Sequence, residues 1–153
     1  TIFMACVVQK LLYSLESAWL NKTLLQKLDG FFARCLRQIL KISHSYKSRV
    51  SNKYVLQQFQ APALSSILLQ RQLLLFGEIA RLPNEDVVRQ TVFHENGINI
   101  KLALDKRRGR PRKIWNQEIN ALAMQCSQGF DLHDMVMDKQ RWAAHVKSFC
   151  KTR

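Results

Sequence analysis

The segment Leu64–Leu82 constrains the fold most, because it is apolar almost all round a helical wheel. A helix of this kind must pack against neighbours on several sides to be stable in water. A few polar residues interrupt it: Gln70, Arg71, Gln72, Glu78 and Arg81. These interruptions make it a poor membrane span, so we expect no membrane partner. Because the 153 residues include only five glycines and three prolines, the sequence predicts an all-α fold, a helical bundle.

A second helix is predicted over Leu24–Ile42, with Asn21 or Thr23 available to cap its start. Its apolar positions fill one broad arc: Leu24, Leu25, Leu28, Phe31, Phe32, Cys35, Leu36, Ile39 and Leu40. Four cations fall within about 80° of one another on the opposite side: Lys27, Arg34, Arg37 and Lys41. No acid lies among them, and like charges at helical spacing repel one another. This face is therefore either a solvated surface or a contact for a polyanion.

Further helices follow from periodicity and capping signals. Ile2–Leu15 is predicted as a buried helix, although a strand stays open there. The other expected helices are Ser51–Phe59 with Ser51 as N-cap, Glu85–Phe93, Pro111–Cys126 with Pro111 in the first turn, a short helix capped by Asp131, and Lys139–Cys150.

Positive charge is concentrated in two regions of the chain. Twenty-four Lys/Arg against eleven Asp/Glu give a net charge of +13. Residues 1–60 carry +7 and residues 101–113 carry +6, whereas residues 61–100 carry −1 and residues 114–153 carry +1. Such a distribution attracts polyanions. By charge alone nucleic acid is the first candidate and an anionic membrane surface the second, and of the two we expect nucleic acid to be the partner.

The second basic region contains a short motif with a mechanical rationale. Its residues are Arg107, Arg108, Gly109, Arg110, Pro111, Arg112 and Lys113. Proline keeps the backbone extended and glycine permits close approach, so that arginines can enter a narrow, negative A·T-rich minor groove. The motif resembles the AT-hook. Three other interpretations remain open: a general phosphate-binding arm for DNA, RNA or a hybrid duplex, a nuclear-import signal, and a solvated linker. We expect a nuclear protein, or otherwise an intracellular one.

The chain shows no set of residues typical of catalysis. It contains no nucleophile elbow, no phosphate-binding glycine loop and no HExxH zinc motif. The set Cys126, His133, His145 and Cys150 lacks the close ligand pairs of zinc sites. We therefore expect no metal, no other cofactor and no enzymatic activity, and four free thiols in a reducing compartment.

Six segments in order carry a family resemblance: Leu11–Leu20, Leu28–Ile42, Arg49–Gln58, Leu68–Pro83, Arg107–Trp115 and Asp138–Lys147. Together they resemble the carboxy-terminal part of LINE-type non-long-terminal-repeat retrotransposon reverse transcriptases. Relatives usually have glycine where this chain has Ser14. The resemblance implies a thumb-like helical domain in residues 1–93, an irregular segment with the basic linker in 94–113, and a helical C-terminal segment in 114–153.

The resemblance also implies a function. The catalytic aspartates of that family lie in an upstream polymerase domain, and this chain has no Asp-Asp pair, so this part should bind primer–template or target DNA without polymerising. A thumb helix in the family follows the primer–template backbone. From its geometry, the Lys27/Arg34/Arg37/Lys41 face is our candidate for that contact. Two alternatives stay open, namely a small chromatin-type AT-hook protein and a helical protein-interaction module with a nuclear-import signal.

Overall fold

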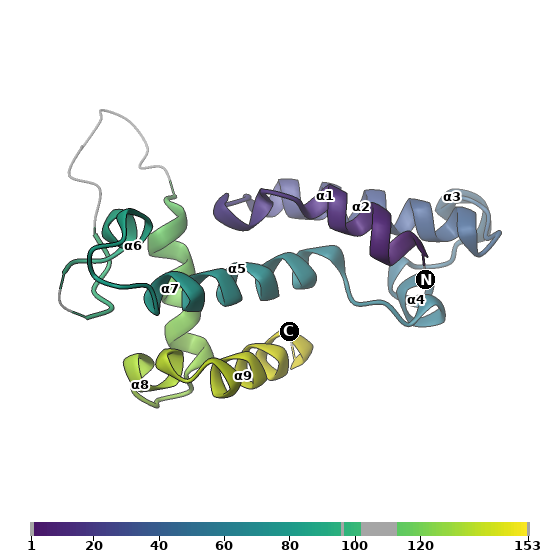
Figure 1. Cartoon of the computed structure of the whole chain (residues 1–153). Coiled ribbons are helices and arrows are strands. Elements are labelled where there is room, and N and C mark those ends of the chain that lie inside the picture. The colour runs from purple at the N-terminus through teal and green to yellow at the C-terminus, as the bar shows by residue number, and fades with distance from the viewer. Residues whose placement is uncertain (1, 96, 102–112, 153) are drawn as a thin grey trace. The chain divides into compact units, whose positions relative to one another are not determined.

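The computed structural model describes residues 2–95, 97–101 and 113–152, and this part of the chain is all-α, as the sequence predicts (Figure 1). Its elements in order are η1 (Phe3–Val8), α1 (Gln9–Leu12), η2 (Leu15–Ser17), α2 (Lys22–Ile39), α3 (Ser45–Ser48), α4 (Asn52–Phe59), α5 (Leu64–Ala80), α6 (Val87–Val92), α7 (Trp115–Cys126), α8 (Leu132–Met137) and α9 (Lys139–Thr152). Within the described residues, β pairing is limited to one isolated antiparallel bridge between Phe93 and Ile100.

Helix starts follow the predicted caps. The side chain of Asn21 accepts a hydrogen bond from the Leu24 amide at 2.8 Å, and that of Ser51 accepts one from the Tyr54 amide at 3.2 Å. Asp131 caps α8 in the same way. These side chains satisfy amides that have no partner inside the first turn of a helix. The capping predictions at Asn21, Ser51 and Asp131 are thus confirmed.

The N-terminal segment differs from the prediction of one buried helix over Ile2–Leu15. It forms a π-helix, η1, which continues as α1 only as far as Leu12. Of its apolar residues only Val8 and Leu12 are buried, and Ile2 is 83% exposed. The segment is therefore less buried than its apolar composition predicts. Ser14 takes a left-handed conformation with φ of 61°, so the turn that glycine would favour forms with serine.

The chain divides into two compact units, which are described separately. The basic unit is Leu20–Leu68, and the split unit combines Thr1–Trp19 with Leu69–Arg153. The boundary between them lies inside α5. Segments on both sides of residues 94–113 belong to the split unit, and the expected division at residues 93 and 113 stays a prediction.

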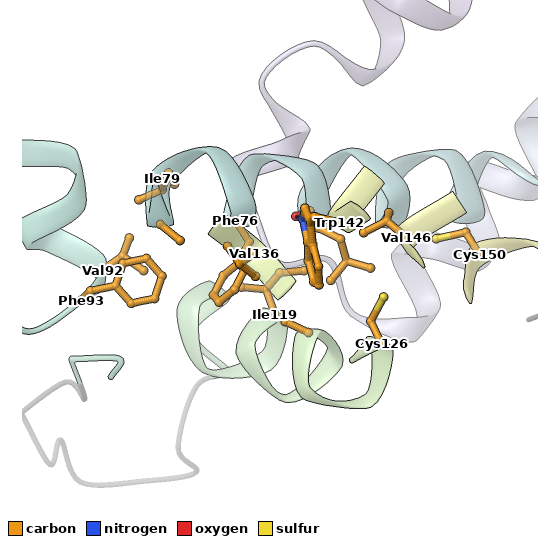
Figure 2. Packing of buried hydrophobic residues seen from close by; sticks show 13 residues of the cluster. Phe76, Ile79, Val92, Phe93, Ile119, Cys126, Val136, Trp142, Val146 and Cys150 are labelled. Atoms are coloured by element: carbon orange, nitrogen blue, oxygen red, sulfur yellow. Dashed lines mark hydrogen bonds between the residues drawn. The ribbon is translucent and has the colours of Figure 1, made fainter. Parts of the chain in front are cut away.

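The core of the split unit joins α5 to the C-terminal helices (Figure 2). Phe76 on α5, Ile119 on α7 and Trp142 on α9 are fully buried in it. The indole Nε1 of Trp142 donates to the Leu73 carbonyl oxygen at 2.9 Å. A Cβ atom at Gly77 would lie 2.5 Å from the Trp142 ring, so glycine permits this close approach. The C-terminal helices therefore complete the core of α5.

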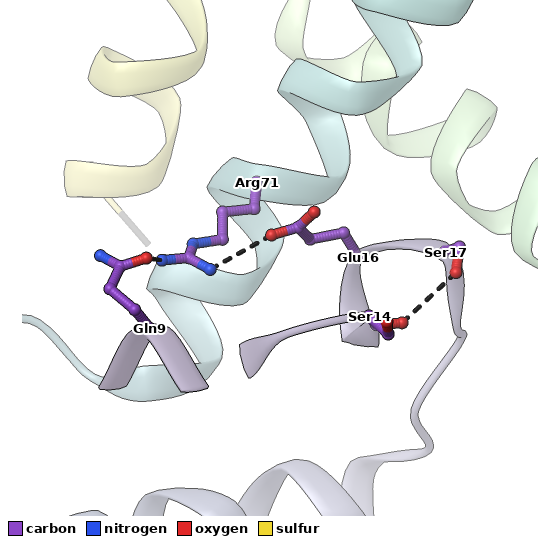
Figure 3. Close-up of polar contacts among 5 residues, drawn as sticks. All are labelled: Gln9, Ser14, Glu16, Ser17 and Arg71. Atoms are coloured by element: carbon purple, nitrogen blue, oxygen red, sulfur yellow. Dashed lines mark hydrogen bonds and ion pairs between the residues drawn. The ribbon is translucent and has the colours of Figure 1, made fainter. Parts of the chain in front are cut away.

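Two polar residues of α5, Arg71 and Gln72, hold the N-terminal segment of the split unit, and Figure 3 shows the contacts of Arg71. Arg71 forms an ion pair with Glu16, with 3.1 Å between Nη1 and Oε1, and also donates to Gln9. Gln72 donates to the Ala18 carbonyl oxygen at 2.7 Å. Polar residues that interrupt the apolar pattern of α5 thus bind another segment. No helix among the described residues has both the length and the apolar character needed to span a bilayer.

The basic unit contains α2, α3, α4 and the beginning of α5. Its buried apolar residues include Phe32 and Leu36 of α2, Val55 of α4 and Leu64 of α5. Asp29 accepts hydrogen bonds from the amide and the hydroxyl of Ser65, at 2.8 and 2.7 Å. This carboxylate therefore fixes the beginning of α5 to the middle of α2.

Candidate nucleic-acid interface

The net positive charge of the chain belongs to the basic unit and to residues 101–113. The basic unit has eight Lys/Arg and one acid, a net charge of +7 in 49 residues. Residues 101–113 have seven basic residues and one acid. The remainder of the split unit has nine Lys/Arg and nine Asp/Glu, so it is neutral. Any electrostatic attraction for a polyanion must therefore arise in these two regions.

The basic unit presents its cations to solvent without an acidic counterpart. Seven of them are exposed: Lys22, Lys27, Arg34, Lys41, Lys47, Arg49 and Lys53. Its single acid, Asp29, is occupied by Ser65. Ion pairs found within the described residues all belong to the split unit. The charge of the basic unit is consequently available to an external anion.

Arg37 does not share the solvent exposure of the other predicted contacts. It is 5% exposed, and its guanidinium donates to the Val50 carbonyl oxygen at 2.6 Å and to Asn52 Oδ1 at 3.1 Å. A third, longer bond of 3.4 Å reaches the Ser43 carbonyl oxygen. Arg37 therefore ties the end of α2 to the segment that follows it. The expectation that it lies on an open helix face is wrong, since the wheel does not show the returning loop.

Lys41 also lies off the helix face that the sequence predicts. α2 ends at Ile39, and Lys41 has a left-handed φ of 55°. The Ile42 amide donates to the Arg37 carbonyl oxygen at 2.9 Å, and the Lys41 amide to that of Gln38 at 3.2 Å. This pair of bonds is a Schellman motif, which closes a helix. Lys41 is exposed but belongs to the turn, so Lys27 and Arg34 are the members of the predicted set that share the exposed face of α2.

A pocket of about 390 Å³ opens beside Arg34. Its lining comes from α2 and from the segment that Arg37 holds: Gly30, Arg34, Arg37, His44, Ser45, Tyr46 and Asn52. The rings of His44 and Tyr46 are stacked, with centroids 5.9 Å apart and planes 13° apart. Tyr46 is 75% exposed. The sequence predicts the cations of this site but not its aromatic residues: Tyr46 lies in the short helix α3 and His44 is its N-cap residue, in a polar stretch with no periodic signal.

Most of the predicted basic motif lies outside the described residues, namely Arg107, Arg108, Gly109, Arg110, Pro111 and Arg112. Lys113 is described; it is exposed and forms an ion pair with Glu118 at 3.1 Å. α7 begins at Trp115 with Ile114 as its N-cap residue. Among the described residues the helix thus begins at Trp115, later than expected, while Pro111 itself lies outside them; the predicted end at Cys126 is confirmed.

Two other arginines have structural partners that the sequence did not reveal. Arg89 is 5% exposed; it donates to the Ala80 carbonyl oxygen at the end of α5 and to the Gly97 carbonyl oxygen at 3.1 Å. Arg81 donates to the Val136 carbonyl oxygen at 2.7 Å. Both line a second pocket, of about 490 Å³, in the neutral part of the split unit. Because these guanidinium groups are held by backbone carbonyls, this pocket is a weaker candidate for an anion.

The residues considered for zinc have different environments. Cys126 and Cys150 are buried in the core, while His133 is exposed and lies 3.6 Å from Asp134. Burial, and secondarily the neighbouring Cys150, raises the pKa of the Cys126 thiol to about 11. Burial thus disfavours the thiolate, which is the form of cysteine that binds a metal. Cys126 is therefore best described as a core residue.

Comparison with known proteins assigns no function to this chain. No protein-family model matches it, and no curated protein or solved structure is significantly similar to it. The function must therefore be argued from the charges, the pocket and the sequence motifs described above.

Proposed function

We propose that this chain is a non-catalytic nucleic-acid-binding module and that the basic unit is its main contact surface. The observation that carries the proposal is the concentration of seven exposed cations around a single, occupied carboxylate. A phosphate backbone suits such a surface, since neutralising its charges releases condensed counterions. The rest of the split unit, being neutral outside residues 101–113, supplies a scaffold.

The sequence resemblance suggests which nucleic acid this is. If the chain is the thumb and post-thumb part of a LINE-type reverse transcriptase, its ligand is a primer–template hybrid or the target DNA, and its partner is the upstream polymerase domain. Lys27, Arg34 and Lys41 would then contact the phosphate backbone. Arg37 supports them by fixing the segment beyond α2.

The test compares two charge-matched triple variants. Lys27, Arg34 and Lys41 are changed to Gln in the first; Lys139, Lys147 and Lys151, exposed on α9, are changed to Gln in the second. Binding to a DNA duplex, an RNA–DNA hybrid and an RNA duplex is measured by fluorescence anisotropy across a salt series. Log K falls as log salt rises, and each lost phosphate contact makes this slope less steep by about 0.9 on duplex DNA.

We expect the first variant to lose affinity and up to about three units of slope, and the second to stay near the wild type. Equal effects of the two variants would mean that net charge alone matters and would overturn the assignment to the basic unit. Absence of binding by the wild type at low salt would reject the function and favour a protein-interaction module. Circular dichroism spectra of both variants check that they fold.

A second candidate function rests on the sequence Gly109-Arg110-Pro111. If these residues form an AT-hook, the chain prefers A·T-rich duplexes, as a small chromatin protein would. Arg110→Ala and Pro111→Ala should then abolish the A·T preference while leaving affinity for G·C-rich duplexes nearly unchanged. If they weaken binding to both duplexes equally, the linker contacts phosphate only.

A further inference from the structure

The pocket beside Arg34 combines groups that recognise different parts of a nucleotide. Arg34 is exposed and cationic, and Tyr46 offers a largely exposed aromatic ring. At about 390 Å³, its volume falls within the range of about 300–1,000 Å³ for small-ligand sites. Its lining is polar and aromatic, so a charged ligand with a flat ring suits it better than an apolar ligand.

Hydrogen bonds within the basic unit hold the residues that line this pocket in place. Arg37 holds Val50 and Asn52, and the Ser48 hydroxyl donates within the same segment to the Ser43 and His44 carbonyl oxygens. The parallel stack with His44 restrains the ring of Tyr46. A preorganised aromatic surface binds a base without an added cost of ordering the side chain.

The side of the pocket formed by α2 is left open by Gly30. A Cβ atom built at Gly30 meets no other atom within 4 Å, so the space there is unfilled. Glycine in a helix interior costs stability relative to alanine, by about 1 kcal/mol. Here no close packing on Gly30 offsets that cost, in contrast to Gly77.

We propose that this pocket binds one unpaired nucleotide of a single strand, with the base stacked on Tyr46 and the phosphate held by Arg34. A base inside a duplex has both faces covered by its neighbours, whereas an unpaired base can offer a face to Tyr46. This inference rests on the proposed nucleic-acid-binding function. It adds a preference for single-stranded segments, such as overhangs, that phosphate contacts alone do not give.

The experiment measures anisotropy with single-stranded DNA, single-stranded RNA and a blunt duplex, each of about 12 nucleotides per strand, within the site sizes of about 4–16 known for strand-binding domains. Tyr46→Ala should weaken single-strand binding roughly 5- to 150-fold, which is the range for loss of one stacked base. Tyr46→Phe keeps the ring and should retain the affinity. Blunt-duplex binding should not change in either variant.

Two further variants separate stacking from other effects. Tyr13→Ala removes a tyrosine of similar exposure, 79% against 75%, from the split unit and should leave binding unchanged. Gly30→Leu places a side chain in the open space and should weaken single-strand binding without removing charge or unfolding the protein. Loss on DNA, on RNA or on both supports the pocket and identifies the strand that it accepts.

The outcomes test the nucleotide pocket separately from the proposed nucleic-acid-binding function. If Tyr46→Ala and Gly30→Leu bind both single strands as the wild type does, while the Lys27/Arg34/Lys41 variant loses duplex affinity, the pocket is overturned and the function stands. If the wild type binds no nucleic acid, both are rejected. A loss in Tyr46→Ala that is equally large on the blunt duplex would also overturn the nucleotide pocket.

Discussion

At the scale of single residues, two arginines show why charge in a sequence does not fix exposure. Arg37 and Arg89 are both about 95% buried, and each donates to backbone carbonyl oxygens. Buried guanidinium groups need such partners, because an unsatisfied buried charge is costly. The sequence places Arg37 correctly on α2, but no local pattern reveals its partners, which lie between the end of α2 and the start of α4.

Alanine substitutions at two glycines of the described helices, Gly77 and Gly30, should change the stability of the protein in opposite directions. Gly77→Ala should destabilise the protein by about 1–3 kcal/mol, because its Cβ would overlap the buried Trp142 ring and displace it from the Leu73 carbonyl. Gly30→Ala should stabilise it by about 1 kcal/mol, since the new methyl group meets nothing and helix propensity improves. Urea unfolding midpoints check both, and effects of the same sign would contradict the packing described here.

The buried thiol of Cys126 adds a pH dependence to stability. Its pKa is about 11 in the folded protein, against 9.0 for a free thiol. The fold favours the protonated form, so this contribution is complete below pH 9 and is lost as pH rises through about 11. As the pH rises from 9 to about 11, the free energy of unfolding should fall more for the wild type than for Cys126→Ala. Urea unfolding of both proteins across this range measures the difference, and parallel curves would exclude the effect.

At the scale of elements, local signals predicted most helices. The caps at Asn21, Ser51 and Asp131 and the long α5 follow from patterns contained within a few turns. Where a helix ends depended on backbone geometry without a residue signature, as at Lys41, which takes a left-handed φ that glycine usually supplies. Gly77 inside an apolar helix was a signal of close packing, but its partner Trp142 could not be read from the sequence.

The packing of α9 against α5 makes the C-terminal helix essential to the split unit. Trp142→Ala removes the largest side chain of the core and should cost about 3–5 kcal/mol, a large part of the stability of a typical domain. Trp142→Phe keeps much of the volume and should cost less. Thermal unfolding followed by circular dichroism compares them. A small loss in Trp142→Ala would mean that α9 is an appendage after all.

At the scale of the whole molecule, the sequence revealed where charge is concentrated but not which segments form a unit. The basic region at residues 1–60 was evident from counting, whereas the partnership of Thr1–Trp19 with Leu69–Arg153 depends on contacts between distant segments. Apolar faces are interchangeable in a sequence pattern, so periodicity does not determine which of them meet. The pocket lining escaped prediction for the same reason.

Two units should respond separately to local changes. Hydrogen exchange followed by mass spectrometry should show Gly30→Ala slowing exchange mainly in peptides of Leu20–Leu68, and Gly77→Ala speeding it mainly in Leu69–Ala80 and Trp115–Thr152. Under urea the wild type should then depart from a single two-state transition. Uniform changes across all peptides in both variants would show one cooperative body.

The discontinuity of the split unit also sets an order of events during synthesis. The basic unit is a continuous stretch and is complete once Leu68 has been added, whereas Thr1–Trp19 must wait for partners translated later. Trp142, which closes the core, comes near the C-terminal end of these residues. A nascent chain halted before Trp142 would therefore carry a complete basic unit while the apolar residues of α5 still lacked their covering helix, and such exposed surfaces are what chaperones recognise.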